Sequence, residues 1–470
     1  MRESPELLER SRFRRRFLTA GVWAFVGKAL SVFGAFLVFL IVSGTLCDED
    51  TSAFVYCESA AVIGTIFATA GLHTVIVRVL RSWKNGDYHD SLFAFGLRIV
   101  GVYFGAFGVV AVVAVVICSS LDAARILPVS EYLGIVLCWI FLMGANQIVS
   151  EFLRGFENFR DAATMGGQTP GALTLAILLS VLIACRMAAI MSLSLVFSIQ
   201  ILAMTATLFW GLFRLSRTAA VQRMVEIKTL PGSNNRTGFR DIISEGLPNL
   251  GSQVSTLGVS HLEILMVGQI CSGPNVAIYA GMKRLVQLTS APLLMVNVTL
   301  PTFIADLVTQ RKLAKLEAIL RGSATLCLLP LLFVSSIFIF APVATISLIF
   351  PHEYISGAKT LQLLSLGNIA SVATGSCGLL LVMTGRPRHA MLIGIIAAIV
   401  FIVTAIPLTS EYGITGMSVA VAGVTAFRNV VCMLLAKRSV GIWTAASLSP
   451  KTFRSLSSVF RRFNVKDDGQ

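Results

Sequence analysis

Apolar residues in this chain recur in long stretches, unlike the alternating pattern of exposed strands or the narrow apolar stripe of soluble helices. Each stretch holds about 20–29 residues, and a helix of about 20 apolar residues crosses a hydrocarbon core ~30 Å thick. The pattern therefore predicts an all-α polytopic membrane protein with twelve transmembrane helices. The predicted spans are residues 18–46, 54–80, 92–118, 132–153, 165–185, 187–213, 241–270, 275–303, 322–350, 357–384, 389–409 and 412–436.

One long polar interruption divides these spans into two sets of six. It covers residues 214–240 and is rich in Lys and Arg. Transporters built from repeats commonly have this six-plus-six layout, with the substrate path at the repeat interface. The predicted organisation is a basic N-terminus (1–17), an N-lobe (18–213), a linker (214–240), a C-lobe (241–436) and a basic tail (437–470).

The distribution of positive charge indicates the orientation of the spans. A net charge of +14 would suggest nucleic-acid binding in a soluble protein, but 55% of the residues are hydrophobic and only 13% are charged. About thirty of the 38 Lys and Arg residues fall on one side of the alternating spans, and basic connections stay in the cytoplasm. The sequence thus predicts cytoplasmic N and C termini and contact with membrane lipids, and no nucleic-acid partner.

The nine cysteines form no C-x-x-C pair and no cluster with histidine, so the sequence predicts neither a metal site nor a cofactor. Cys47 and Cys57 flank the first outward connection. They either form a disulfide there or remain unpaired in apolar surroundings, and the sequence leaves both readings open.

Several cations lie inside the predicted spans, where a charged group needs a partner or water. Lys28 is about eleven residues into the first span, so about 16 Å deep at 1.5 Å per residue. Lys283 and Arg284 lie within the eighth span, and Arg78 lies nearer the inner end of the second. These side chains either face a water-filled cavity that draws in an anionic group or, for Arg78 above all, extend to the headgroups.

Acidic residues are rarer in the spans. Glu263 lies on the seventh span close to His261. Two readings of Glu263 remain open, namely a proton or sodium site that couples transport and an ion pair with one of the embedded cations. Because embedded cations outnumber embedded acids, the pattern favours an anionic substrate over an organic cation.

Short motifs along the chain carry a family likeness through their order and spacing. They are Gly71–Arg78, Leu153–Phe159, Gly268–Gln269, Val276–Tyr279, Leu300–Pro301, Phe350–Tyr354, Thr384–Pro387 and Tyr412–Met417. With these motifs the chain resembles, over nearly its whole length, the polysaccharide (O-antigen type) flippases of the multidrug/oligosaccharidyl-lipid/polysaccharide (MOP) exporter superfamily.

The resemblance implies two six-helix lobes in a MATE-like V, with spans 1, 2, 7 and 8 lining a central cleft. It also implies a substrate of polyprenyl (undecaprenyl) diphosphate-linked oligosaccharide, flipped across the inner membrane of a bacterial cell for surface polysaccharide or lipopolysaccharide synthesis. Lys28, Arg78, Lys283 and Arg284 fall on the cleft-lining spans and would bind the diphosphate. Glu263 falls where family members often carry an acid, and polysaccharide polymerase or ligase machinery is an expected partner.

Other functions fit the sequence less well. A MATE-type multidrug or cation exporter shares the architecture but needs a carboxylate where the first span has Lys28. A lipid II-type flippase usually has two further helices, for which the chain has no room. An enzyme is not expected, because the chain has no phosphate-binding Gly loop and no nucleophile with a base at a useful spacing.

Overall fold

The computed structural model describes residues 5–84, 92–120, 131–167, 169–218, 238–254, 259–271 and 273–447. Over these residues the chain is almost entirely helical, and an isolated β-bridge joins Gly166 to Pro170. Most of the predicted linker and the tail after residue 447 lie outside the described residues. Contacts divide the chain into two compact units, Met1–Ala277 and Ile278–Gln470.

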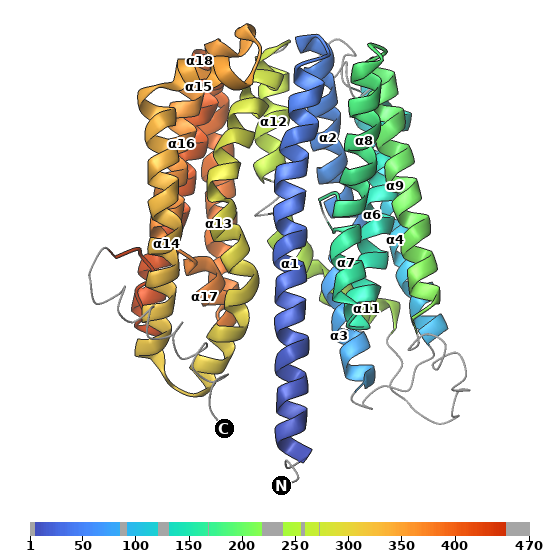
Figure 1. Ribbon diagram of the computed structural model, residues 1–470, viewed down its shortest axis with the longest axis vertical. Coiled ribbons are helices and arrows are strands. Elements are labelled where there is room, and N and C mark those ends of the chain that lie inside the picture. The colour runs from blue at the N-terminus through green and yellow to red at the C-terminus, as the bar shows by residue number, and fades with distance from the viewer. Residues whose placement is uncertain are drawn as a thin grey trace. The chain divides into compact units, whose positions relative to one another are not determined.

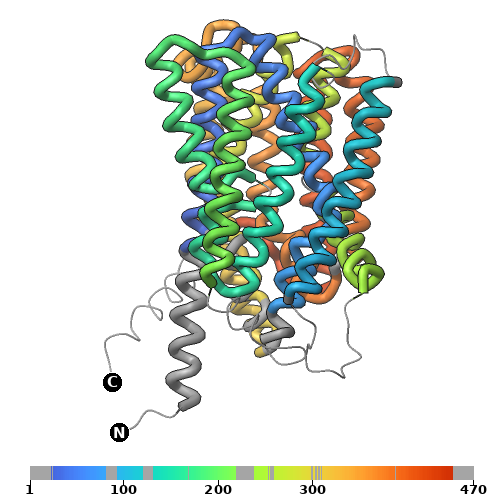
Figure 2. Tube along the Cα trace, turned by 90° about the vertical axis from the view of Figure 1, so that its right-hand side faces the viewer, coloured from blue at the N-terminus to red at the C-terminus, as the bar shows by residue number. Residues whose placement is uncertain are grey.

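The first unit holds the helices of the first six predicted spans and also those of the seventh. Its helices are α1 (Pro5–Ser43), α2 (Asp48–Thr69), α3 (Leu72–Lys84), α4 (Leu92–Ser120), α6 (Leu133–Gly155), α7 (Phe159–Met165), α8 (Ala172–Met187), α9 (Leu193–Ser216), α11 (Phe239–Gln253) and α12 (Val259–Ile270). Figure 1 shows α2 and α12 in the upper half of this unit and α3 and α11 in the lower half. Figure 2 shows α11 beside the lower part of α4, where Phe239 packs against Gly101.

The second predicted span is a broken helix. Ala70 and Gly71 have φ of 46° and 72°, in the left-handed region, and these two residues separate α2 from α3. A Cβ atom on Gly71 would lie 2.2 Å from the backbone oxygen of Gly246, and one on Gly246 would lie 2.4 Å from the oxygen of Ala70. Glycine at both positions therefore lets the connection between α2 and α3 touch α11 backbone to backbone.

Helix α6 packs against α2, α3 and α9 in the first unit. Gly144 leaves room for the ring of Tyr103, whose hydroxyl donates to the Phe141 carbonyl at 2.6 Å. Toward the end of α9, Arg214 Nε donates to Asp161 Oδ2 at 2.6 Å, and Asp161 is 3% exposed. This ion pair joins α7 to α9, and losing either partner would leave the other charge without compensation.

The second unit contains the remaining helices. They are α13 (Asn275–Thr309, which begins just before the boundary), α14 (Leu313–Phe340), α15 (Pro342–Ile349), η3 (His352–Gly357), α16 (Ala358–Thr374), α17 (Cys377–Met383) and α18 (Pro387–Val440). Non-helical backbone at Gly413 (φ 60°, ψ −141°) divides α18. The two parts fold back on each other, since Ile393 shares a core cluster with Cys432 and Ala436.

A short segment after α18 packs across α14 and α16; residues 441–447 are called the strap below. Thr444 Oγ1 donates to the Thr374 carbonyl at 2.7 Å, and Ala446 N donates to that of Ala373 at 2.8 Å. These are terminal carbonyls of α16, which have no partner within their own helix. Ser447 N donates to Thr325 Oγ1 of α14 at 2.9 Å, so the strap ties the two helices together.

Seven of the described helices are long and apolar enough to cross a bilayer, or up to eight if the bent pair His352–Thr374 and Cys377–Met383 forms one span. The apolar helices Ala172–Met187 and Val259–Ile270 are shorter. Along the 27-residue span Phe93–Ser119 most side chains are exposed, as expected of a surface that faces lipid hydrocarbon. Cys47 and Cys57 are free thiols, so the disulfide reading is not realised in this structure.

Candidate functional site

Lys28 lies on the face of α1 next to the stripe that packs into the first unit. Gly27, Ser31 and Gly34 form this stripe. A Cβ atom added to Gly27 would lie 3.1 Å from Ala163, and one added to Gly34 would lie 2.7 Å from Leu175. Ser31 Oγ lies 2.8 Å from Thr169 Oγ1 and 3.0 Å from the Pro170 carbonyl. Lys28 itself is half-buried, and within the described part of the chain no carboxylate or carbonyl pairs with its ammonium group.

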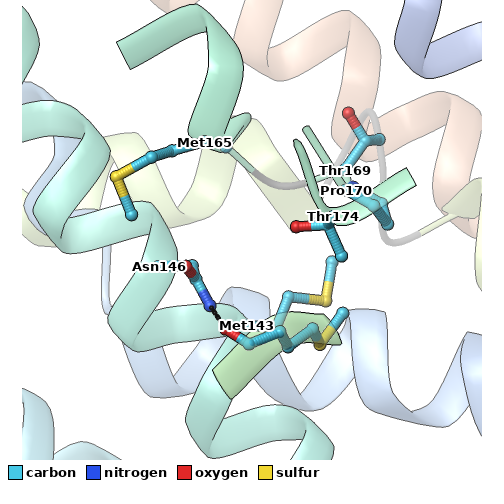
Figure 3. Close-up of a pocket in the computed structure, with 8 residues that line it drawn as sticks. Met143, Asn146, Met165, Thr169, Pro170 and Thr174 are labelled. Carbon is cyan, nitrogen blue, oxygen red and sulfur yellow. Dashed lines mark hydrogen bonds between the residues drawn. The ribbon is translucent and has the colours of Figure 1, made fainter. Parts of the chain in front are cut away.

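A small cavity lies beside this contact, between α6, α8 and α9 (Figure 3). Asn146 lines it, and its Nδ2 donates to the carbonyls of Leu142 (2.9 Å) and Met204 (3.1 Å). Asn146 Oδ1 has no protein partner among the described residues. The cavity volume of about 10 Å³ is enough for one water-sized particle and far too small for a sugar headgroup.

Arg78 lies on α3 and forms an ion pair with Glu245 of α11. The two side chains are 60% and 36% exposed. Sequence reasoning placed Arg78 among the cations but did not identify Glu245 as its partner, so the cationic character expected of Arg78 is partly neutralised. The signal was present, because Glu245 recurs with Asn249 and Gln253 at four-residue intervals, which places all three on one helical face.

Two hydrogen bonds continue the α3–α11 contact beside this ion pair. Asn249 Nδ2 pairs with Thr74 Oγ1 and also donates to the Glu245 carbonyl at 3.0 Å. Gln253 Nε2 lies 2.9 Å from His73 Nδ1. These three pairs, Arg78–Glu245, Thr74–Asn249 and His73–Gln253, are called the polar ladder below. They fix which residues of α3 and α11 face each other.

The predicted ion-coupling residues lie on α12, which packs along α2. His261 Nδ1 is 3.4 Å from Ser59 Oγ, and Glu263 is 4% exposed. Residues two apart on a helix point about 200° apart, so His261 and Glu263 do not share a helical face. Further along, Gln269 Nε2 donates to the Tyr56 hydroxyl at 2.6 Å, where Gly268 leaves room for the Tyr56 ring.

Lys283 and Arg284 lie on α13 in the second unit, and both are half-buried. Their neighbours Met282 and Leu285 are buried at 0% and 3% exposure, so the pair borders the core of this unit. Consecutive residues point about 100° apart, so the two cations present their charge in different directions. In the first unit, Lys28 and Arg78 lie on separate helices.

No protein-family model matches the chain. No curated protein matches it either. Solved structures do match it, and they include an inward-facing multidrug resistance MATE family transporter of the MOP superfamily. That match has a TM-score of 0.70 and 14% identity, and covers 90% of this chain and 98% of the other.

Two further solved structures are similar. A MOP superfamily transporter from Pyrococcus furiosus, described as having a binding pocket of reversed polarity, gives a TM-score of 0.60 at 16% identity and covers 91% of this chain and 95% of the other. An outward-facing multidrug resistance MATE family transporter gives 0.59 at 17% identity over 90% and 95%. The expected fold is confirmed: this chain is an all-helical, polytopic membrane protein with the fold of the MATE transporters of the MOP superfamily.

Proposed function

We propose that this protein is a transporter that moves a polyprenyl diphosphate-linked oligosaccharide from the inner to the outer leaflet of the cytoplasmic membrane by alternating access. The fold supports transport as the activity. It leaves the substrate open, because a MOP superfamily transporter is described as differing in function by the polarity of its pocket. The polarity of the embedded side chains therefore carries the argument on substrate class.

Lys28 is the observation that carries this proposal. Lys28 is half-buried in a membrane helix, and no anionic side chain compensates its ammonium group among the described residues. A lysine facing hydrocarbon would cost at least ~2.5–3.5 kcal/mol, so this one is expected to face water or an anionic ligand. A diphosphate supplies the missing negative charge, and the polyprenyl chain stays in the bilayer.

The other predicted site residues contribute to this proposal in different ways. Lys283 and Arg284 add positive charge on α13, and Arg78 adds a guanidinium that it shares with Glu245. Glu263 is buried and is the candidate for proton or sodium coupling, with His261 two residues before it. The released repeat unit would pass to polymerase or ligase machinery at the outer face.

A multidrug cation exporter remains the second candidate. It is favoured by two of the matching structures, which are described as multidrug resistance transporters. It is also favoured by the Arg78–Glu245 pair, which removes one positive charge from the count of embedded cations. Against it stands Lys28, since an ammonium group without a counter-charge repels a cationic drug.

The substitution Lys28→Ala tests the proposal in cells that depend on this protein for their surface polysaccharide. We expect Lys28→Ala to reduce surface polymer at least tenfold with unchanged protein level in the membrane, because a charge-assisted contact to phosphate is lost. Lys28→Arg should retain part of the export. Lys359→Ala removes an exposed cation at the start of α16 and serves as the matched control.

Two results would contradict the proposal. Normal polymer export with both Lys28→Ala and Arg284→Ala would show that the embedded cations do not bind the substrate. Loss of ethidium efflux on deletion of the protein, with surface polymer unchanged, would favour the cation exporter instead.

A further inference from the structure

The ion pair Arg78–Glu245 lies where a ligand can reach it. Both side chains are partly exposed, at 60% and 36%. A half-exposed ion pair contributes little to stability, typically well under the strength of a charge-assisted bond to phosphate. A more highly charged anion can therefore replace the Glu245 carboxylate as the partner of the Arg78 guanidinium.

The rest of the polar ladder keeps Glu245 opposite Arg78. Both amide hydrogens of Asn249 are used, one on Thr74 Oγ1 and one on the Glu245 carbonyl. Gln253 contacts His73 one turn further along, and the backbones meet at Gly71 and Gly246. These contacts hold Glu245 opposite Arg78, so its carboxylate competes with any other anion for the same hydrogen-bond donors.

Planar guanidinium donors bind two oxygens of a phosphate at once, and a diphosphate carries more negative charge than one carboxylate. A diphosphate that takes these donors leaves Glu245 next to a second anion. The repulsion between them then acts against the α3–α11 contact at this end of the ladder. A ligand with less negative charge displaces Glu245 less completely.

We infer that Glu245 is a positioning and specificity-determining residue, which the diphosphate of the substrate displaces from Arg78 and which thereby loosens α11 from α3. This inference rests on the proposed function. Under this inference Glu245 has two effects beyond a purely structural contact with Arg78. Glu245 restrains the affinity for phosphate so that the headgroup can leave again, and the exchange links ligand binding to movement of α11.

The test measures binding of farnesyl diphosphate to the purified full-length protein by isothermal titration. Glu245→Gln should tighten binding about two- to five-fold, the affinity equivalent of an exposed ion pair, because the competitor is removed. Arg78→Ala should weaken binding about tenfold, and Arg78→Ala with Glu245→Gln should match Arg78→Ala alone. Glu317→Gln, which breaks the ion pair with Arg321 inside α14, should change nothing.

The outcomes separate this inference from the proposed function. No binding of farnesyl diphosphate by the unmodified protein would overturn both. Binding by the unmodified protein with equal or weaker binding by Glu245→Gln would overturn the inference alone. A purely structural ion pair also predicts weaker or unchanged binding, so only an increase in affinity supports the exchange.

A second measurement follows the helix contact itself and does not need the Glu245 variant. Thr74→Cys with Asn249→Cys should form a disulfide on mild oxidation, detected by mobility after cleavage at a protease site inserted between residues 219 and 237. Farnesyl diphosphate should slow this cross-linking at least threefold, and should have no effect when Arg78→Ala is added. An unchanged rate with bound farnesyl diphosphate would refute the loosening of α11.

Discussion

Single residues decide how closely the helices of the first unit approach. Gly246 is the sharpest case, because any Cβ there would lie 2.4 Å from the Ala70 oxygen, a backbone atom that cannot rotate away. Single residues also decide the local charge, as Lys28 and Glu245 show. Lys28 is a cation without a counter-charge among the described residues, whereas Glu245 pairs with Arg78, for which the sequence alone indicated no partner.

Gly246→Ala should therefore destabilise the protein. We expect a loss of about 1–3 kcal/mol, as for other overpacked contacts, measured as a lower unfolding temperature in detergent. Gly251→Ala on the same helix is the matched control, since its Cβ meets nothing within 4 Å. An alanine at 251 should leave stability unchanged or raise it slightly. Equal behaviour of the two variants would contradict the backbone contact.

At the scale of elements, the apolar stretches predicted where helices occur but not where they break. The second, ninth and tenth predicted spans each consist of two helical pieces, and the last two spans form the single divided helix α18. The seventh holds α11 and α12, and the residues between these helices lie outside the described part of the chain. Hydropathy averaged over some twenty residues does not register a local backbone feature such as the left-handed φ at Ala70. The polar ladder was also missed, because α11 was counted within an apolar span although one of its faces is polar.

The strap after α18 was not foreseen either, since its residues look like the start of a basic tail. Ile442 and Thr444 are buried at 1% and 0% exposure, and Thr444 also satisfies a terminal carbonyl of α16. Truncation after Val440 should lower stability by at least ~2 kcal/mol through lost apolar burial and hydrogen bonds. Thermal unfolding checks this, and truncation after Ser447 is the control because it keeps the strap. Equal stability of the two truncations would show that the strap contributes nothing.

At the scale of the whole molecule, the charge pattern predicted orientation and the embedded charges predicted substrate class. The all-helical polytopic fold is confirmed by the solved structures, whereas the cytoplasmic termini and the four proposed diphosphate-binding cations stay predictions. The reason is physical. Long apolar runs specify helices by themselves, but a binding site depends on which side chains from distant spans meet.

Orientation has a direct test in intact cells. Ser233→Cys places a thiol in the predicted linker, which basic connections assign to the cytoplasm. A membrane-impermeant maleimide should label it only after the cells are opened, with the protein free of other reactive thiols as a background. Labelling in intact cells would reverse the predicted orientation of all spans.

The seventh predicted span has a consequence for biogenesis. Its helices α11 and α12 pack against α2 and α3, which are synthesised about 170 to 210 residues earlier. Until the ribosome reaches residue 270, Ser59, His73 and Arg78 are in the membrane without the polar partners that cover them in the finished protein. The polar surface of α2 and α3 is therefore completed only once α11 and α12 have been synthesised and have packed against it.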